Sequence, residues 1–359
     1  MKVMTLFGTR PEIIRLSQII KQLDQFCEQV MVHTGQNYDP NLSDIFFREL
    51  QVRPPDIRLG IQATSFAEQA GQIIIKVGEA LSSIKPDRLL ILGDTNSGLA
   101  AIVAARMGIA VYHLEAGNRC YDDRVPEEIN RRIIDHSSTV LMPYTHRSKE
   151  NLLREGIERQ RIFVIGNPIY EVLNTYQAQI EASDVLSRLG VSRGNFFLAT
   201  VHRAENVDDP DRLKRLFAGL KRVADSYQQP LIVSLHPRTA HQLTRLGFDP
   251  QSERLRLIQP LGFFDFVKLE REARCVLSDS GTVQEECCIF KVPNITLRDV
   301  TERAETIECG SSILSGDDPD LILQAVHIAL ATSSNWQPPA EYVEAEVSRA
   351  VTKIVLGYR

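Results

Sequence analysis

Short apolar runs alternate with longer amphipathic stretches along most of this chain. In the first half the runs are VMTLF, QVMVHT, RLLILG, AVYHLEA, TVLMPY and IFVIG. Such alternation is typical of βαβ units, in which a parallel sheet is covered by helices on both faces. We therefore predict a doubly wound, Rossmann-like α/β domain over residues 1–168.

The same pattern restarts in the second half. A polar, helix-prone segment follows IFVIG, and the apolar runs then resume as FFLATV, PLIVSLH, RLRLIQP, RCVLSD and PNITL. This predicts a second Rossmann-like domain over residues 169–339. The final stretch, PPAEYVEAEVSRAVTKIVLGYR, predicts a helix that begins after its prolines and carries Val343, Val347 and Val351 on one face.

The composition excludes several classes of protein. The 359 residues include 41 basic and 46 acidic side chains, a net charge of -5, so no general attraction to nucleic acid or to an anionic membrane is expected. The six cysteines form no CxxC pair and no zinc-ligand spacing with histidine, which argues against a metal site and a disulfide framework. The start MKVMTLFGTR is too quickly charged for a signal peptide, so we expect a cytoplasmic protein.

Residues that can carry chemistry follow directly after the apolar runs. In open parallel sheets, ligands bind beyond the carboxyl ends of the strands. Arg10, Asp94 and Glu115 follow three runs of the first half, and His202 and Ser280 follow two runs of the second. The sequence therefore predicts a site at these strand ends.

Two of the junctions have the pattern of an anion-binding helix N-terminus. In FGTRPE a glycine leaves the strand and a proline enters the helix, and in SDSGTVQEE Ser280 and Gly281 turn into the next helix. Each junction could equally serve only to cap its helix. A Walker A lysine and a GxGxxG fingerprint are absent from the sequence, which argues against an NTPase and a dinucleotide-dependent dehydrogenase.

The stretch HLEAGNRCYDDRVPEEINRR is unusually rich in opposed charges. From Pro126 onward, the spacing of Val125, Ile129 and Ile133 predicts a helix with an apolar stripe. Glutamates and arginines four residues apart could form ion pairs on its exposed side, as on any solvated helix. The alternative is that Glu127 turns toward the predicted site.

Three carboxylates near cationic groups would suit proton transfer at carbon. Glu115 and Glu127, together with Asp94, offer one ionised base and one protonated acid. From the second half, His202 and Arg203 would suit the charge of a leaving phosphate, although a histidine at a strand end is often only structural.

Seven ordered motifs carry a resemblance to a known family. They are GTRPE, LGDTNS, HLEAGNR, VPEEINRR, HRAEN, SDSGTVQEE and LRDVTER, and they extend from residue 8 to residue 303. Together they resemble the non-hydrolysing UDP-N-acetylglucosamine 2-epimerase family. The resemblance implies two Rossmann-like domains with an interdomain cleft, similar to GT-B glycosyltransferases, and a C-terminal helix over residues 340–359 that packs back on the first domain.

The resemblance also implies a reaction without a cofactor. UDP would be eliminated in an anti sense from a UDP-linked 2-acetamido sugar to give a 2-acetamidoglycal, and would then add back with the proton delivered to the other face of C2. The product would be a precursor of surface polysaccharides, and the enzyme would be a homodimer.

Site roles follow from the same resemblance, residue by residue. Asp94, Glu115 and Glu127 look like the acid/base carboxylates around the sugar, and His202 looks like the catalytic histidine near the phosphate. The residues expected to bind the substrate or its UDP moiety are Arg10, Arg15, Arg131, Ser280, Gly281, Thr282, Glu286 and Arg303. Among these, Glu286 resembles the carboxylate that binds the ribose hydroxyls.

The chain departs from the family pattern at three places. Arg15 stands where a lysine is usual, and Thr282 replaces the second glycine of an SGG motif. A GQH loop associated with activation by a second UDP-sugar reads Gly35-Gln36-Asn37 here, which argues against such activation.

The substrate remains open at this point. Three stretches look more like the branch that converts UDP-2-acetamido-2,6-dideoxy-L-talose to UDP-N-acetyl-L-fucosamine; they are NRCYDDRVPEEINRRI, SLHPRT and PLGFFD. We give this substrate the same weight as the pair UDP-GlcNAc and UDP-ManNAc. The alternatives from other classes are a GT-B glycosyltransferase, a hydrolysing epimerase and a non-catalytic UDP-sugar sensor.

Overall fold

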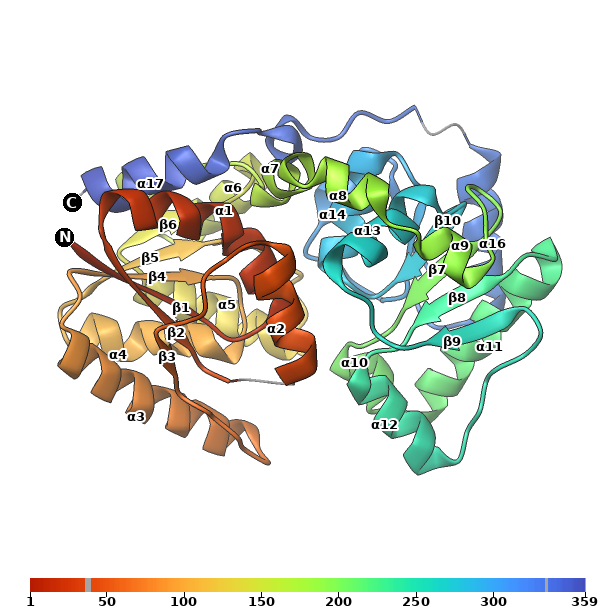
Figure 1. Cartoon of the computed structure of the whole chain (residues 1–359), viewed down its shortest axis with the longest axis horizontal. Helices are drawn as coiled ribbons and strands as arrows, with labels where there is room; N and C mark the ends of the chain where they lie inside the picture. Colours follow the sequence, from red (N-terminus) through yellow and green to blue (C-terminus); the bar gives the residue numbers. More distant parts are fainter. Residues whose placement is uncertain (36–39, 333–334, 359) are drawn as a thin grey trace. The chain divides into compact units, whose positions relative to one another are not determined.

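The structure is a computed structural model that describes residues 1–35, 40–332 and 335–358 (Figure 1). The chain divides into two compact units. Unit 1 comprises Met1–Thr175 and Ala340–Arg359, and unit 2 comprises Tyr176–Pro339. Each unit is built around its own parallel sheet of six strands.

The sheet of unit 1 has the strand order β3-β2-β1-β4-β5-β6, and every neighbouring pair is parallel. Its strands are β1 (Lys2–Phe7), β2 (Glu28–His33), β3 (Ile57–Arg58), β4 (Arg88–Leu92), β5 (Ala110–Leu114) and β6 (Val140–Met142). Strands β1, β4 and β5 are almost wholly buried, as expected for a parallel sheet covered on both faces.

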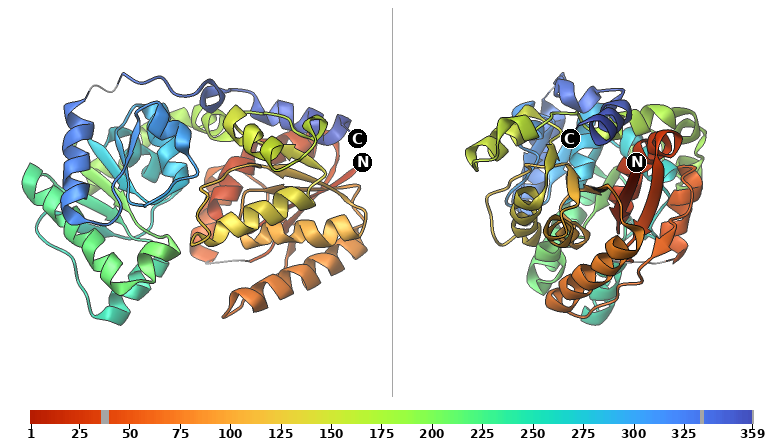
Figure 2. Two further views of the ribbon diagram at one scale, coloured as in Figure 1. Left: turned by 180° about the vertical axis from the view of Figure 1, so that it is seen from behind. Right: turned by 90° about the vertical axis from the view of Figure 1, so that its left-hand side faces the viewer.

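The helices of unit 1 form one layer on each face of this sheet (Figures 1 and 2). They are α1 (Arg10–Phe26), α2 (Pro40–Glu49), α3 (Phe66–Ile84), η1 (Asn96–Leu99), α4 (Ala100–Arg106), α5 (Pro126–Ser137), α6 (His146–Arg154), η2 (Arg159–Arg161), α7 (Pro168–Thr175), η3 (Ala340–Val343) and α17 (Val347–Gly357). Helix α1 contacts α7 and α17 on one face, and α4 contacts α3 and α5 on the other.

The C-terminal segment lies in unit 1, where α17 packs against α1. Its α-helix begins at Val347, because residues 340–343 form a 3₁₀ turn instead of the expected first α-helical turn. Val347 and Val351 are fully buried, but Val343 is 37% exposed and does not belong to the same apolar face. Helix α7 also groups with unit 1, whereas the boundary inferred from the sequence placed residues 169–175 in the second domain.

Unit 2 has the strand order β12-β11-β10-β7-β8-β9, again with every pair parallel. The strands are β7 (Phe197–Thr200), β8 (Leu231–Ser234), β9 (Leu255–Ile258), β10 (Cys275–Ser278), β11 (Asn294–Thr296) and β12 (Ser312–Leu314). The helices are α8 (Gln177–Ala182), α9 (Val185–Leu189), α10 (Ala204–Val207), α11 (Pro210–Tyr227), α12 (Pro237–Leu246), α13 (Phe263–Glu272), α14 (Gly281–Phe290), α15 (Ala304–Glu308) and α16 (Pro319–Ala331).

Alternate residues of β7 enter two separate cores of unit 2. Phe197 and Ala199 pack in the cluster that contains the apolar faces of α11 and α16. Leu198, which points to the other face of the sheet, packs in the cluster that contains Leu269 of α13 and Val283 of α14. Burial of both faces explains why β7 is largely apolar in sequence.

The two sheets share one topology, because counting strands within each unit gives the order 3-2-1-4-5-6 twice. This order defines a doubly wound Rossmann-type sheet, and the prediction of two such domains is confirmed. The order reverses between β1 and β4 in unit 1 and between β7 and β10 in unit 2. Ligand-binding crevices of such sheets open at these reversal points.

Some strand assignments from the sequence were wrong. IFVIG is not a strand, since only Ile162 of this stretch forms an isolated bridge, to Leu141. The short edge strands β3 and β12 have no apolar run and were not predicted. Across residues 1–35, 40–332 and 335–358, no helix combines the length and the hydropathy needed to cross a membrane.

Candidate active site

The loop after β1 is organised by Glu12, a residue that the sequence analysis did not select. Its carboxylate accepts hydrogen bonds from the amides of Gly8 and Thr9, at 3.0 and 2.7 Å, and from the Thr9 hydroxyl at 2.7 Å. Burial raises the pKa of Glu12 to about 7, although these hydrogen bonds act to lower it. Its sequence signal is the Thr-x-x-Glu capping box at the start of α1.

Arg15 and Glu115 form a buried ion pair in unit 1. Their side chains are 3% and 8% exposed, so neither charge is well solvated and each depends on the other. The Arg15 guanidinium also lies over the Tyr144 ring, 5.6 Å from its centroid. On the other side, Asn118 donates to Glu115 Oε1 at 3.2 Å.

Glu115 is held in an uncommon backbone conformation. It directly follows β5 and has a φ of +67°, in the left-handed region that disfavours residues with a Cβ atom. The ion pair with Arg15 and the hydrogen bond from Asn118 stabilise the carboxylate in this position and favour its ionised form. Such strain is frequent at functional sites.

Asp94 and Arg131 form another ion pair near the strand ends of unit 1. Arg131 Nε donates to Asp94 Oδ2 at 2.8 Å, and Arg131 Nη1 donates to Glu128 Oε2 at 2.7 Å. Asn130, the neighbour of Arg131 on α5, donates to the backbone oxygen of Asp94 at 3.0 Å. The first two turns of α5 therefore hold Asp94 in place in the loop after β4.

Helix α5 does not bury the apolar stripe expected from its sequence. Ile129 and Ile133 are 48% and 36% exposed, and the buried face instead carries Glu128, Arg131 and Asp135. Periodicity failed here because these charged groups are compensated by partners on neighbouring loops and strands, as in the 2.8 Å pair between Asp135 and Arg119. Glu127 lies in the first turn of α5 and is half-buried.

The side chains of His202 and Asp279 lie in direct contact in unit 2. His202 follows β7, Asp279 follows β10, and His202 Nδ1 lies 2.9 Å from Asp279 Oδ1. Because an ionised carboxylate can only accept, Nδ1 carries the proton that it donates to Asp279. The imidazole is 32% exposed, so its Nε2 remains available to a ligand.

Asp279 is fully buried yet ionised. Burial alone would raise its pKa, but the charge of His202, its hydrogen bond, and hydrogen bonds from the Arg203 amide and Asn206 together lower the pKa below its usual value. The Arg203 amide donates at 2.9 Å and Asn206 Nδ2 at 3.0 Å. The sequence analysis missed this role, although the position of Asp279 directly after an apolar run was a signal.

The N-terminus of α14 lies beside Asp279, with Ser280 as its first flanking residue and Gly281 as its first helical residue. A Cβ atom at Gly281 would lie 2.7 Å from Glu302 Oε1, so the close approach of the Glu302 side chain favours glycine here. Thr282 is half-buried in the first turn. Unsatisfied amides and the helix dipole make such an end favourable for an anion.

Arg303 is buried next to this helix end. Its Nε lies 2.5 Å from Glu285 Oε1 of α14, and its side chain is 6% exposed. The preceding residue, Glu302, accepts from Arg298 Nη1 at 2.8 Å. The loop 297–303 is therefore tied to α14 by the ion pair of Arg303 with Glu285.

Glu286 lies on the buried side of α14 and faces Glu270 of α13. Glu286 is 3% exposed and Glu270 is fully buried. Burial and the neighbouring Glu286 carboxylate raise the pKa of Glu270 well above its usual value. The protonated form of Glu270 is therefore favoured over a second buried negative charge beside Glu286.

The remaining predictions are placed as follows. Arg10 begins α1 and lies over the Phe46 ring at 5.8 Å from its centroid. Gln36 and Asn37, from which the absence of allosteric activation is predicted, lie outside the described residues. Within the described part of the chain, no group of three or more histidine, cysteine, aspartate or glutamate side chains is arranged to hold a metal ion.

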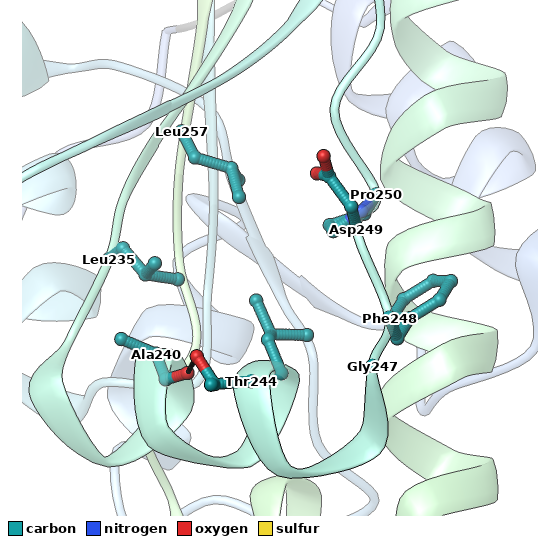
Figure 3. A pocket seen from close by; sticks show the side chains of 9 residues that line it. Leu235, Ala240, Thr244, Gly247, Phe248, Asp249, Pro250 and Leu257 are labelled. Atoms are coloured by element: carbon teal, nitrogen blue, oxygen red, sulfur yellow. Dashed lines mark hydrogen bonds between the residues drawn. The ribbon is translucent and has the colours of Figure 1, made fainter.

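A pocket in unit 2 is separate from these residues (Figure 3). It lies between α12 and the chain that leads into β9, and its labelled lining includes Leu235, Phe248 and Leu257. None of the predicted site residues lines it. Its lining is mostly apolar, with Asp249 as the one carboxylate among the nine lining residues.

The fold and these two sets of residues define a class of protein. The two Rossmann-type sheets have the same strand order, but different residues lie at their strand ends. In unit 1 these are acids paired with arginines, and in unit 2 they are a histidine–aspartate pair beside a helix N-terminus. This is a two-domain α/β enzyme of the nucleotide-binding type.

Comparison with known proteins identifies the family. The family model described as UDP-N-acetylglucosamine 2-epimerase matches residues 21–356. A UDP-N-acetylglucosamine 2-epimerase of Methanocaldococcus jannaschii is 43% identical over 347 residues, 94% of this chain and 95% of that protein. The chain belongs to the UDP-N-acetylglucosamine 2-epimerase family and is an isomerase of the epimerase type.

Solved structures agree with this assignment. A Methanocaldococcus jannaschii UDP-GlcNAc 2-epimerase in complex with UDP-GlcNAc and UDP is 40% identical, with a TM-score of 0.94 and 99% of both chains covered. A glycosyltransferase involved in lipopolysaccharide biosynthesis shares only the fold, at 13% identity and a TM-score of 0.62.

The relatives found by sequence include an epimerase named for another sugar. A Pseudomonas aeruginosa UDP-2,3-diacetamido-2,3-dideoxy-D-glucuronate 2-epimerase is 36% identical, with 92% of both chains covered.

Proposed function

We propose that this enzyme is a non-hydrolysing 2-epimerase of a UDP-N-acetylhexosamine. The observation that carries the proposal is the placement of Asp94 and Glu115 at the ends of adjacent strands β4 and β5, each paired with a buried arginine. Carboxylates held in this way suit removal and return of a proton at carbon. Family membership supports the same conclusion.

The proposed reaction has two halves that mirror each other. A carboxylate of unit 1 removes the C2 proton of the sugar, the C1–O bond breaks, and UDP leaves with the bonding electrons in an anti elimination. The resulting 2-acetamidoglycal stays bound while UDP adds back at C1 and a proton is delivered to the opposite face of C2. Asp94, Glu115 and Glu127 are the proposed acid and base groups.

Unit 2 is proposed to stabilise the leaving UDP. The amides at the start of α14, with Ser280, Gly281 and Thr282, would receive the diphosphate, and Arg303 would add positive charge. His202, oriented by Asp279, would donate from Nε2 to a phosphate oxygen in its charged form. Glu286 would accept hydrogen bonds from the ribose hydroxyls, and Arg10, Arg15 and Arg131 would complete the charged surroundings.

We propose UDP-GlcNAc and UDP-ManNAc as the substrate pair, because relatives that are 43% and 40% identical to this chain are named for UDP-N-acetylglucosamine. The 6-deoxy-L-talose substrate is the second candidate. SLHPRT, one of the motifs that suggested it, contains His236, whose ring centroid lies 5.5 Å from that of His202. We further propose a homodimer, for which sedimentation equilibrium would return twice the mass of the chain.

Chromatography of the reaction mixture tests the proposal. Purified enzyme incubated with UDP-GlcNAc, without acceptor, metal or nicotinamide, should yield UDP-ManNAc and reach an equilibrium mixture with little free UDP. Stoichiometric UDP with free N-acetylmannosamine would instead identify a hydrolysing epimerase. Consumption only on addition of an acceptor would identify a glycosyltransferase, and binding without turnover of either candidate substrate would identify a sensor.

A further inference from the structure

Two cysteines of unit 2 lie in direct contact. The sulfur atoms of Cys288 and Cys309 are 3.6 Å apart, although the residues are 21 positions apart in sequence. Cys288 lies near the end of α14 and is buried, and Cys309 directly follows α15 and is half-buried. Both are free cysteines, and Cys309 is the more exposed residue of the two.

The surroundings distinguish Cys309 from the other cysteines. Its sulfur lies 3.4 Å from Ser311 Oγ, and the hydrogen bond from Cys288 lowers the pKa of Cys309 to about 6. Burial raises the pKa of Cys27, Cys275 and Cys287. Since the thiolate is the reactive form, Cys309 should react first with an oxidant.

We propose that Cys288 and Cys309 are an oxidisable pair that forms a reversible intramolecular disulfide, with a peroxide as oxidant. The Cys309 thiolate attacks one peroxide oxygen, the O–O bond breaks, and after proton transfer sulfenic acid and water are formed. The sulfur of Cys288 then attacks the Cys309 sulfur, and a second water leaves as the disulfide forms. Each disulfide consumes one peroxide and two thiol protons.

The contact needs only a small change to become a bond. The sulfurs must approach from 3.6 Å to about 2.05 Å. Cys309 is the C-cap of the short helix α15, which is a single turn of five residues, so it can move more easily than the core residue Cys288. A half-buried sulfur that touches a buried one is also the arrangement of an attacking cysteine with its resolving partner.

The disulfide would close a ring that contains the loop 297–303. This loop carries Arg303 and Glu302, which are tied to the first half of α14 by ion pairs and close contact. The cross-link would restrict the unfolded chain and hold the loop against α14, so the oxidised form should be more resistant to unfolding. This inference does not depend on the proposed reaction.

The tryptophan Trp336 lies next to the cysteine pair and can serve as a fluorescent probe of its oxidation. Trp336 is the single tryptophan of the chain, and its Nε1 donates to the backbone oxygen of Cys288 at 3.0 Å. Formation of a disulfide at Cys288 should therefore change the intrinsic fluorescence of the protein, and a reductant should restore it.

The experiment treats the full chain with a small excess of hydrogen peroxide and then alkylates the remaining thiols. We expect free thiols to fall from six to four per chain, a tryptic peptide joining Cys288 to Cys309 before reduction, and a reversible fluorescence change. The melting temperature of the oxidised form should rise by about 5–10 °C. Cys309→Ser and Cys288→Ala should each abolish the cross-link and the rise.

Cys27→Ala is the matched control, because Cys27 is also half-buried but lies in unit 1; this variant should oxidise like the wild type. If Cys309 is overoxidised without a cross-link, if the disulfide joins two chains, or if another cysteine pair is recovered, the assignment is wrong. A melting temperature that does not rise on oxidation would refute the stabilising role.

Discussion

His202 Nδ1 lies 2.9 Å from a carboxylate oxygen of the fully buried Asp279, and this contact links the loops that follow strands β7 and β10. The contact has two consequences. It holds a proton on Nδ1, and it leaves Nε2 available to a ligand. A role of His202 at the phosphate would depend on both.

Asp279→Asn should therefore impair catalysis more than binding. The neutral amide can no longer stabilise the positive charge of the His202 imidazolium that would donate to the leaving phosphate, so kcat should fall by about 100- to 10,000-fold while KM changes little. Steady-state kinetics on both substrate epimers would measure this split. Asp225→Asn, at an exposed position of α11, is the control and should keep wild-type kinetics.

Arg15 should be required for the stability of unit 1. Arg15→Leu leaves Glu115 buried without its main cation, and removal of one partner of a buried pair costs about 3–5 kcal/mol. Arg15→Lys keeps the charge but not the planar geometry, so this variant should lose less stability than Arg15→Leu. Urea denaturation of the two variants would compare the losses; equal stability of the leucine variant and the wild type would contradict the assigned role.

Gly281→Ala should weaken the binding of UDP. The added methyl group would lie 2.7 Å from Glu302 Oε1, so the Glu302 side chain would have to shift and its ion pairs with Arg203 and Arg298 would be disturbed. Overpacking of about 1–3 kcal/mol predicts at least about a fivefold increase in Kd, measurable by calorimetry. Gly71→Ala on α3 is the matched control, because no heavy atom lies within 4 Å of the added carbon and the affinity should not change.

Glu12 should make the stability of the enzyme depend on pH. Because its pKa rises on folding from 4.5 to about 7, its contribution is fully present below about pH 4.5 and is lost as the pH rises toward 7. The loss amounts to at most about 3 kcal/mol. The free energy of unfolding of the wild type should therefore fall relative to that of Glu12→Gln between pH 4.5 and 7, and a pH-independent difference would contradict this account.

The parallel sheets could be predicted because their central strands are buried on both faces and therefore consist of runs of apolar residues. The edge strands β3 and β12 could not, because two or three residues at a sheet edge carry no such run. IFVIG has the composition of a strand and lies beside β6, but it forms a single bridge there, and composition does not reveal how many such bridges a segment makes.

The candidate site could be predicted only in outline. The rule that ligands bind at strand ends singled out Asp94, Glu115 and His202 from the sequence alone. Which partners orient them depends on contacts between residues far apart in the chain, such as Arg131 with Asp94 and His202 with Asp279. The buried charged face of α5 was misread for the same reason, since periodicity treats only apolar residues as candidates for burial.

Proton exchange at C2 of the sugar tests the central proposal most directly. With UDP-GlcNAc in D₂O and no acceptor, proton NMR should show loss of the C2–H signal and growth of the UDP-ManNAc anomeric signal, with little free UDP. Glu115→Gln, which preserves the shape of the side chain but removes its charge, should slow the exchange by at least about 100-fold. If UDP-ManNAc forms while its C2 position keeps the original proton, the elimination and re-addition account is wrong.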